Sequence, residues 1–489
     1  MRDLLDGLDV VSVRGDVDVD VRSVVHDSRD VAPGALFACI RGAVTDGHTY
    51  AAAAAGAGAV GLLVEEPMAV DVAQARVPWV RGALGPVAAR FHDHPSAALR
   101  VLGVTGTNGK TTTTYLLDAI ARAAGEVTGV IGTVATRVGG TERPPGRTTP
   151  EADDLQALLA EMRAAAVTTV ALEVSSHALD QHRVDGTRFA AVGFTNLSQD
   201  HLDYHGTMDA YFAAKARLFT PAFTPAAAIS IDDPRGRALV APAAEAGLDV
   251  WTVSVHDETA ALHATAIELA PEHTRLTVEF RRDDARVALE SSLVGAFNVA
   301  NALTAAAIAR AGGFSVEEIA AGLQAPLVVP GRFERVDAGQ DFTVLVDYAH
   351  TPDALERALV AARELVSRNG RLAVVYGCGG DRDRAKRPLM GAIAAAHADT
   401  AYLTSDNPRS EDPAAIAAAV LAGVPADRAP VVELDRRAAI RAAVAAARAG
   451  DVIVIAGKGH EPGQTAAGVT VPFDDRTVAR EALEGERCG

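Results

Sequence analysis

Apolar runs alternate with glycine-rich turns and with alanine-rich stretches of helical spacing along the chain. The apolar run 101–104 leads into Gly106-Thr-Asn-Gly109. The residues that follow, 110–124, place Leu116, Leu117 and Ile120 on one face of a helix. This order predicts a strand, a glycine loop and a helix, which together form a βα unit.

The same alternation returns later in the chain. Residues 170–174 and 190–195 are apolar runs that end in polar clusters, which is typical of parallel strands with a site at their carboxyl edge. Further apolar runs alternate with alanine-rich helical stretches such as 437–448, and they lie at 343–346, 372–376, 400–404 and 451–456. These patterns predict two doubly wound α/β units.

Two polar or proline-containing stretches divide the chain. Its 489 residues are enough for about three domains at roughly 150 residues each. The first part ends in the polar stretch 92–95, and a second linker spans 326–331. We expect an α/β protein of three domains: a smaller α/β domain at 1–95, a central P-loop-type doubly wound sheet at 96–330 and a C-terminal Rossmann-like domain at 331–489.

Charge and composition exclude several classes of protein. A net charge of −17 is unfavourable for binding nucleic acid or an anionic membrane. Cys39, Cys378 and Cys488 are too far apart for a disulfide framework, which indicates a reducing compartment. The N-terminus is too acidic for a signal peptide, and the longest apolar run, 51–64, is shorter than the ~20 residues that span a bilayer. We expect a cytoplasmic protein that binds neither nucleic acid nor membrane.

The glycine loop at 103–112 is the strongest local signal. A strand that feeds a glycine-rich turn and then a helix points backbone N–H groups at one spot. Lys110 adds positive charge there, and Thr111 can hold Mg²⁺. The segment departs from the strict phosphate-loop pattern because Val104, not glycine, stands five residues before Gly109. It still predicts a cradle for the triphosphate of ATP.

Two other glycine clusters are poor candidates for dinucleotide binding. Gly56-Ala-Gly58-Ala-Val-Gly61 has the right spacing, but a helical stretch precedes it and a strand follows, which is the reverse of the required order. Gly377-Cys-Gly-Gly380 follows a strand, yet the next residues, 381–387, are too polar to begin a packed helix. We interpret the second cluster as a basic anion-binding loop.

Three more features allow two interpretations each. Glu173 would lie beside the phosphate loop if the two strands are neighbours, as a Mg²⁺ ligand or as a solvated acid at a strand end. His201 and His205 would share one face of a helix, as metal ligands or as surface histidines. Lys215 lies among apolar residues at helical spacing, either with its ammonium reaching water or as a desolvated, reactive amine.

Short motifs are spread over nearly the whole chain. They lie at 27–29, 103–112, 147–150, 173–177, 195–206, 215, 297–301, 330–334, 347–350, 406–409 and 457–461. In order and spacing the chain resembles the Mur ligases, and in particular the diaminopimelate-adding branch of that family. The resemblance implies an ATP-dependent, ADP-forming amide ligase of peptidoglycan synthesis, with a role in cell wall biogenesis, cell shape and cell division.

The resemblance also implies a reaction. ATP would phosphorylate the D-Glu carboxylate of UDP-MurNAc-L-Ala-D-Glu, and an amine of meso-diaminopimelate would attack the acyl phosphate. The catalytic residues would be Lys110, Glu173, His201 and Lys215. Two Mg²⁺ ions are implied, one held by Thr111 and Glu173, the other by His201 and a carbamylated Lys215. The implied nucleotide contacts are Gly106, Thr107, Asn108, Gly109, Lys110, Thr111, Thr112, Asn298, Asn301, Arg332, Asp347 and His350.

By the same resemblance the three domains bind the UDP substrate, ATP and the amino acid, in that order. Arg147 stands where the family has Asn, and a cation there suits an anionic substrate. The third domain would close over the second to complete the site, in a protein that we expect to be a monomer. The implied contacts of the UDP substrate are Ser28, Ala43, Val44, Thr45, Thr148, Thr149, Ser175, Gln181 and Arg183.

The choice of diamino acid is implied to depend on Arg409. Its guanidinium would bind the second carboxylate of diaminopimelate, which lysine lacks. The alternatives are the same ligase with L-lysine or another diamino acid, an enzyme similar to folylpolyglutamate synthetase, and a P-loop NTPase that is not a ligase. The implied amino-acid contacts are Arg382, Asp406, Asn407, Pro408, Arg409, Gly457 and Glu461.

Overall fold

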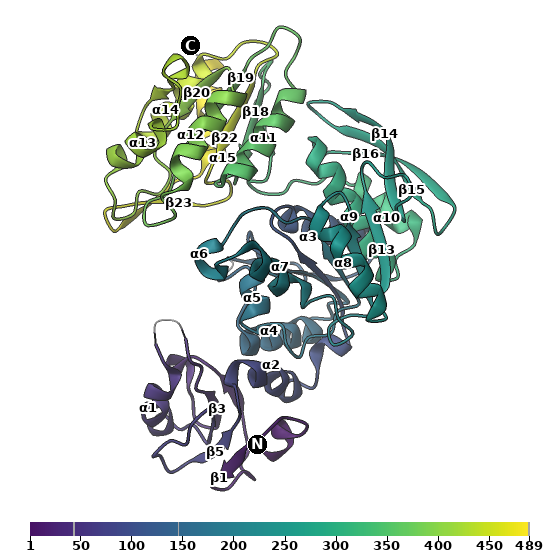
Figure 1. The fold of residues 1–489 in the computed structure, drawn as a ribbon, viewed down its shortest axis with the longest axis vertical. Helices are drawn as coiled ribbons and strands as arrows, with labels where there is room; N and C mark the ends of the chain where they lie inside the picture. Colours follow the sequence, from purple (N-terminus) through teal and green to yellow (C-terminus); the bar gives the residue numbers. More distant parts are fainter. Residues whose placement is uncertain (43–44, 145, 488–489) are drawn as a thin grey trace.

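Three lobes follow one another in the computed structural model, which describes residues 1–42, 45–144 and 146–487 (Figure 1). The N-terminal lobe lies at one end, the C-terminal lobe at the other, and the middle lobe joins them. Each lobe is built around its own β-sheet, as the sequence pattern predicts.

The N-terminal lobe contains a five-stranded sheet in the order β1-β5-β4-β3-β2, parallel except for β1. Alternate side chains of β3 enter two apolar clusters, Leu36 on one face and Phe37 on the other. Helix α1 ends at Gly56 before β4 begins at Gly61, so the helix precedes the strand here, as expected. The elements are β1 (Ser12–Arg14), β2 (Ser23–Val25), β3 (Ala35–Ala38), α1 (Ala51–Gly56), β4 (Gly61–Val64), β5 (Ala73–Arg76) and α2 (Val80–Phe91).

The middle lobe carries an eleven-stranded sheet in the order β16-β15-β14-β13-β12-β11-β6-β10-β7-β8-β9. Its centre is parallel, and antiparallel strands extend both ends. The strands are β6 (Arg100–Thr105), β7 (Thr128–Ile131), β8 (Thr136–Val138), β9 (Thr141–Arg143), β10 (Thr169–Glu173), β11 (Ala191–Phe194), β12 (Ala226–Ser230), β13 (Asp249–Ser254), β14 (Leu262–Leu269), β15 (Thr274–Phe280) and β16 (Ala285–Ser291). The helices are α3 (Lys110–Ala123), α4 (Ala152–Ala164), α5 (Ser176–Asp180), α6 (Leu202–His205), α7 (Met208–Ala216), α8 (Pro234–Glu245), α9 (Ala296–Ala311) and α10 (Val316–Gln324).

Strand β6 lies between β10 and β11 in this sheet. Glu173 of β10 pairs in register with Val104, and Phe194 of β11 pairs with Thr105. The carboxyl ends of the three strands therefore meet beside the glycine loop that follows β6. The sequence predicts this site only if the strands are neighbours, and they are.

The C-terminal lobe is a doubly wound sheet in the order β17-β18-β22-β19-β20-β21, parallel except for β17. Helices α11, α12 and α13 share one apolar cluster with the sheet, and α14 and α15 share another. The strands are β17 (Glu334–Val336), β18 (Thr343–Asp347), β19 (Leu372–Tyr376), β20 (Thr400–Leu403), β21 (Val431–Val432) and β22 (Val452–Ala456), with a separate hairpin of β23 (Gly463–Ala466) and β24 (Val469–Pro472). The helices are α11 (Pro352–Glu364), α12 (Lys386–His397), α13 (Pro413–Leu421), α14 (Arg436–Ala445) and α15 (Asp475–Arg487).

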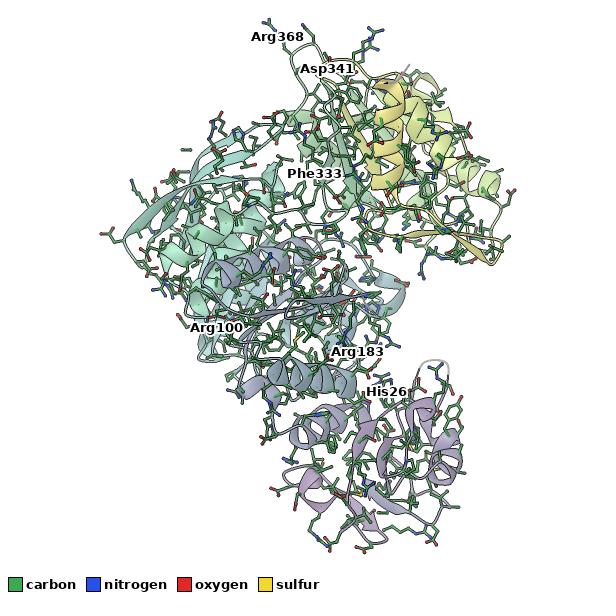
Figure 2. The ribbon with its side chains drawn as sticks, turned by 180° about the vertical axis from the view of Figure 1, so that it is seen from behind. His26, Arg100, Arg183, Phe333, Asp341 and Arg368 are labelled. Atoms are coloured by element: carbon green, nitrogen blue, oxygen red, sulfur yellow. The ribbon has the colours of Figure 1, made fainter. Side chains whose placement is uncertain are left out.

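The N-terminal and middle lobes are joined by direct packing of α2 on α4. Gly85 of α2 is so close to the middle lobe that an added Cβ would lie 2.1 Å from the carbonyl oxygen of Asp185. His26 donates its backbone N–H and its ring Nδ1–H to the carboxylate of Asp153, at 2.8 and 2.9 Å. In Figure 2, His26 and Arg183 lie along this junction, whereas Phe333 lies at the junction of the middle and C-terminal lobes.

Candidate active site

The glycine loop between β6 and α3 is shaped by two residues with positive φ. Gly106 has φ +145°, and Gly109, directly before α3, has φ +86°. A Cβ at Gly106 would lie 1.9 Å from Thr195 Oγ1, and one at Gly109 would lie 2.2 Å from Asn301 Oδ1. Glycine is therefore required at both positions by space as well as by conformation.

Lys110 begins α3 and turns back over the loop. Its ammonium donates to the carbonyl oxygens of Gly106 and Thr107 at 3.0 and 2.8 Å. Burial lowers the pKa of Lys110, and the charges of Glu173 and Asp200 partly offset that effect. A cation held at the start of a helix, with loop carbonyls as its resting partners, is suited to receive a polyanionic ligand.

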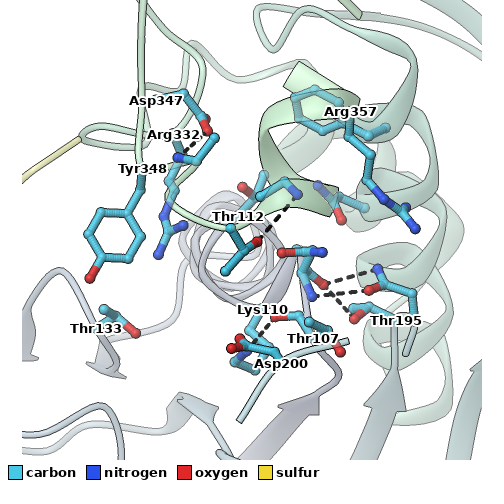
Figure 3. Close-up of a pocket in the computed structure, with 18 of the residues that line it drawn as sticks. Thr107, Lys110, Thr112, Thr133, Thr195, Asp200, Arg332, Asp347, Tyr348 and Arg357 are labelled. Atoms are coloured by element: carbon cyan, nitrogen blue, oxygen red, sulfur yellow. Dashed lines mark hydrogen bonds between the residues drawn. The ribbon is translucent and has the colours of Figure 1, made fainter. Parts of the chain in front are cut away.

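A cavity of about 350 Å³ opens between the glycine loop and the C-terminal lobe. Figure 3 shows Lys110 and Asp200 on one side of it, and Arg332, Asp347 and Tyr348 on the other. Of the implied nucleotide contacts, those that line the cavity are Thr107, Asn108, Gly109, Lys110, Thr112, Asn301, Arg332, Asp347 and His350. Gly106, Thr111 and Asn298 lie behind this lining: Asn298 accepts a hydrogen bond from Asn301, and Thr111 lies 3.4 Å from Arg332.

The C-terminal side of the cavity is held by Asp347, at the end of β18. Its carboxylate accepts hydrogen bonds from the backbone N–H groups of Phe333 and Ala349 at 2.7 and 2.8 Å. Burial raises the pKa of Asp347, against the opposing charge of Arg332. The ring of His350 donates from Nδ1 to the carbonyl of Tyr348 at 2.8 Å, and burial lowers its pKa. The arrangement keeps His350 neutral, with Nε2 as an acceptor.

Glu173 lies buried at the end of β10 and is not a solvated acid. It accepts hydrogen bonds from the backbone N–H and the hydroxyl of Thr133 at 2.9 and 3.0 Å. Gly132 leaves the space for this contact, because a Cβ there would lie 2.3 Å from Glu173 Oε1. A fixed carboxylate beside the phosphate loop has the chemistry of a Mg²⁺ ligand.

The ammonium of Lys215 does not reach water: the residue is 1% exposed. Its Nζ donates to the carbonyl of Gly106 at 2.8 Å and lies 4.5 Å from the centre of the Tyr211 ring. Burial, reinforced by the charge of Lys110, lowers the pKa of Lys215 well below its ordinary value. Of the two interpretations offered for Lys215, an ammonium that reaches water or a desolvated amine, the burial supports the desolvated amine.

The histidine pair does not share a helix face, contrary to the pattern-based expectation. His201 has a left-handed backbone with φ 53° and precedes α6, which covers only Leu202–His205. Both rings approach His177 instead, at centroid distances of 4.7 Å for His201 and 5.5 Å for His205. The tight turn at His201 breaks the helical spacing on which the expectation depended.

A cluster of polar residues continues from the end of β10 toward the N-terminal lobe. Thr149 donates to the carbonyl of Glu173 at 2.8 Å and accepts from the N–H of Ser175 at 3.1 Å. Thr148 contacts Thr133 at 3.0 Å. Arg183 donates to Thr149 O at 3.2 Å and to Gln181 Oε1 at 2.6 Å. The structure thus brings together all five implied contacts of the UDP substrate that belong to this lobe.

Arginines surround a single carboxylate beside this cluster. Glu151 pairs with Arg81 of the N-terminal lobe at 3.2 Å, with Arg183 at 3.1 Å and, very closely, with Arg147. Three guanidinium groups surround this one carboxylate, so positive charge exceeds negative charge immediately around Glu151. Ser28 and Thr45 lie in the N-terminal lobe, whereas Ala43 and Val44 lie outside the described residues.

The implied amino-acid contacts gather at the edge of the C-terminal sheet. Arg409 has φ 54° and joins the β23–β24 hairpin by backbone hydrogen bonds, from its own N–H to Thr465 O at 2.9 Å and from Ala467 N–H to its carbonyl at 2.6 Å. Asn407 donates to Glu461 Oε2 at 2.7 Å. Asn407, Arg409 and Glu461 line a second cavity of about 470 Å³.

The other implied contacts support this second cavity from behind. A Cβ at Gly457 would lie 2.6 Å from Asp406 Oδ2, and one at Gly380 would lie 1.9 Å from Pro408 O. Arg382 lies in the loop beside Gly379, next to the Arg409 side chain. Arg384 of this loop and Arg387, in the first turn of α12, pair with Glu411 at 3.2 and 2.8 Å, so two cations of the expected anion-binding loop are already engaged. Contrary to expectation, a packed helix does begin within 381–387, because the ion pair with Glu411 allows Arg387 to be buried at its start.

Comparison with known proteins identifies the family. Three family models match: "Mur ligase family, catalytic domain" at residues 20–92, "Mur ligase middle domain" at 104–309 and "Mur ligase, glutamate ligase domain" at 331–459. A UDP-N-acetylmuramoyl-L-alanyl-D-glutamate–2,6-diaminopimelate ligase of Streptomyces avermitilis is 47% identical, over 96% of this chain and 93% of that protein. The chain belongs to the Mur ligase family.

Two further similarities extend over the length of this Mur ligase. The protein of the same name from Geobacillus thermodenitrificans is 45% identical, over 96% of each chain. A solved structure of a ligase of that name superposes with a TM-score of 0.72 at 34% identity and covers 96% of this chain and 97% of its own. The three-domain α/β fold expected from the sequence is therefore confirmed.

Sequence reasoning missed several residues of this Mur ligase site. Thr133, Tyr348 and Arg357 line the first cavity, and the β23–β24 hairpin forms a wall of the second. The sequence did contain a signal for the hairpin turn, because Gly468 follows Ala467 between two short segments. In the structure both residues have positive φ, as a tight hairpin turn requires. Within the described residues, none of the helices is both long and apolar enough to cross a membrane.

Proposed function

We propose that this Mur ligase joins meso-diaminopimelate to the D-Glu γ-carboxylate of UDP-MurNAc-L-Ala-D-Glu with ATP as the energy source. The names of the relatives that match nearly the whole chain support the reaction. The observation that carries the choice of diamino acid is the second cavity, which presents a cation, Arg409, and an anion, Glu461. The far end of diaminopimelate carries a carboxylate and an ammonium, which suit these two groups.

The nucleotide would occupy the first cavity, with its phosphates on the glycine loop. Lys110 and the loop N–H groups would stabilise the charge that develops during phosphoryl transfer. The substrate carboxylate attacks the terminal phosphorus, and ADP leaves as an acyl phosphate forms. A neutral amine of the diamino acid then attacks the acyl carbon and displaces phosphate. Closing the cavity between two lobes would exclude water from the acyl phosphate.

The donor set fits Mg²⁺. Glu173 offers a buried carboxylate, Thr111 a hydroxyl at the start of α3 and His201 an imidazole in the lining of the cavity. The lowered pKa of Lys215 supplies the neutral amine that CO₂ needs in order to form a carbamate, with release of a proton. When bound, Mg²⁺ would neutralise phosphate charge during the transfer. Thr111 and Glu173 would hold one ion, and His201 and carbamylated Lys215 the other.

The sugar nucleotide would extend from the end of β10 toward the N-terminal lobe. Thr148, Thr149, Ser175, Gln181 and Arg183 would bind its peptide and sugar, and Ser28 and Thr45 its uridine diphosphate. The excess positive charge around Glu151 suits this anionic substrate. Because ATP and a water-soluble sugar nucleotide are consumed, we place the reaction in the cytoplasm.

One incubation tests the proposal. The enzyme is incubated with ATP, Mg²⁺ and UDP-MurNAc-L-Ala-D-Glu in three reactions, which contain diaminopimelate, L-lysine or ornithine. The products are identified by mass spectrometry. We expect ADP and a tripeptide product with diaminopimelate, and far less with the other two. ATP turnover without a longer peptide would contradict the proposal and favour a P-loop NTPase. Efficient use of L-lysine would contradict the assigned diamino acid.

A further inference from the structure

Lysine is rare in this chain. It occurs at four positions, Lys110, Lys215, Lys386 and Lys458, among 46 lysines and arginines. Lys110 and Lys215 contact the glycine loop, and Lys386 donates to the carbonyl of His350 at 2.9 Å. The chain thus uses arginine for nearly all of its positive charge, and at least three of its lysines contact the first cavity or its immediate support. The proposed function assigns no role to Lys458, which lies away from the first cavity.

Lys458 follows β22 and is completely buried, at 0% exposure. Its Nζ has three acceptors: Gly463 O at 2.6 Å, Glu461 Oε2 at 3.1 Å and Asn407 Oδ1 at 3.2 Å. A lysine ammonium offers three donors, so all of them are used. All three acceptors belong to residues that line the second cavity, and Gly463 also begins its hairpin wall.

These contacts fix the orientation of both pocket side chains. Asn407 Oδ1 also accepts the N–H of Thr465 at 2.9 Å, so its carbonyl oxygen is turned away from the carboxylate of Glu461. The amide Nδ2 therefore points to Glu461 Oε2. Among the described residues nothing donates to Glu461 Oε1, which leaves that oxygen for a ligand.

We infer that Lys458 is a positioning residue for the diamino acid: it holds Asn407 and Glu461 in the orientation that receives the substrate's far ammonium group. The inference rests on the proposed function and adds a residue to it. Lys458 itself touches no substrate, because it is enclosed behind Glu461 and the hairpin. Its loss would weaken the diamino acid's binding and leave the nucleotide cavity, in the cleft between lobes, intact.

The test compares two variants, Lys458→Met and Lys458→Gln, with the surface control Arg363→Ala. Arg363 is partly exposed and pairs with Asp399 at 2.7 Å, away from both cavities. We expect the KM for diaminopimelate to rise by about tenfold to a hundredfold in the Lys458 variants, the effect of a lost charged hydrogen bond. The KM for ATP should stay within about twofold, and acyl phosphate trapped with hydroxylamine should form normally.

A double-mutant cycle with Glu461→Gln sharpens the result. If Lys458 acts through Glu461, the double variant loses less than the sum of the two single losses. Strict additivity would overturn the inference, as would an unchanged KM for diaminopimelate in whichever Lys458 variant folds. A parallel loss of acyl phosphate formation would also overturn it, since that indicates general disruption of the lobe. Failure of the unaltered enzyme to make any tripeptide would instead overturn the proposed function, and this inference with it.

Discussion

The two junctions between lobes are built differently. The N-terminal junction is packed: α2 lies on α4, Gly85 touches the backbone of Asp185, and buried Asp153 accepts from His26. The C-terminal junction surrounds a cavity of about 350 Å³. Beside the cavity, Phe297 packs on Phe333, and Asp353 of α11 accepts hydrogen bonds from Asn108 and Ser198. A packed junction holds a binding surface in one position, whereas a junction around a cavity can open to admit a ligand.

The largest loss of activity is expected at Lys215, which is buried behind the glycine loop of the first cavity. Lys215→Ala should lower ligation by about 10²–10³-fold or more, since it removes a group that we assign to transition-state charge stabilisation. Lys215→Arg keeps a cation that forms no carbamate and should be equally inactive. Product formation, measured by mass spectrometry, checks both variants. Full activity of the alanine variant would remove the carbamate from the mechanism.

The next largest effect is expected on the use of diaminopimelate when Arg409, in the second cavity, is replaced. Arg409→Ala should weaken the use of diaminopimelate by about 1.5–3 kcal/mol, the range for a hydrogen bond to a charged group. Arg409→Lys retains charge but loses the paired donors, so it should recover only part of this loss. Steady-state kinetics with diaminopimelate at saturating ATP measure both. An unchanged KM for diaminopimelate would argue against the contact.

Asp353 provides a direct test of the difference between the junctions. Its Oδ2 accepts from Asn108 Nδ2 at 2.9 Å and from Ser198 Oγ at 2.7 Å, and so ties α11 to the glycine loop. Asp353→Ala should raise the KM for ATP by about fivefold, or about 1 kcal/mol.

Glu356→Ala is the matched control for Asp353, because Glu356 is an acid of the same helix that pairs with His397 at 3.3 Å and does not line the first cavity. It leaves both contacts of Asp353 to the middle lobe in place. Its KM for ATP should change less than that of Asp353→Ala. If the two variants behave alike, the contact across the junction does not hold the nucleotide loop.

The smallest expected effect is on stability: the contribution of the His26–Asp153 contact at the N-terminal junction should depend on pH. Burial opposes protonation of His26, but the hydrogen bond and charge of Asp153, with Asp154 and Glu151 nearby, raise its pKa overall. Because the folded-state pKa is raised, this stabilisation is fully present below the unfolded value of about 6.5 and is lost as pH rises through the folded-state pKa.

Asp153→Asn should therefore lower the melting temperature more at pH 6 than at pH 8.5, with a contribution of about 1 kcal/mol. Thermal unfolding followed by calorimetry at the two pH values measures the difference. The KM for ATP should stay unchanged, because the junction lies on the other side of the middle lobe. An equal destabilisation at both pH values would contradict a role for His26 protonation.

Local patterns in the sequence were sufficient to predict those parts of the site that lie within one short segment of the chain. The glycine loop, Glu173 at a strand end and Lys215 within a helix each depend on a short segment, and the structure has them where expected. The strands β14, β15 and β16 were not predicted, although they are consecutive hairpins and β15 alternates buried with more exposed positions. Contacts between separate lobes, in contrast, depend on long-range packing that no local pattern encodes.

The same reason explains the site residues that sequence reasoning missed. Asp353 is an ordinary acid in the first turn of a helix, and only the approach of the lobes brings it to Asn108. Lys458 was inside a motif, but its three acceptors come from segments at 407 and 461–463. The error at His201 has a local cause, since a left-handed residue ended the helical spacing.

Because this enzyme contains so few lysines, few of its side chains can react with reagents that modify amines. Because Lys215 and Lys458 are enclosed, reagents that acylate amines will report chiefly on Lys110 and Lys386, which line or support the first cavity. Labelling with and without ATP, measured by mass spectrometry of the peptides, would therefore report whether the nucleotide cavity is occupied. In most proteins the many other lysines would obscure this signal.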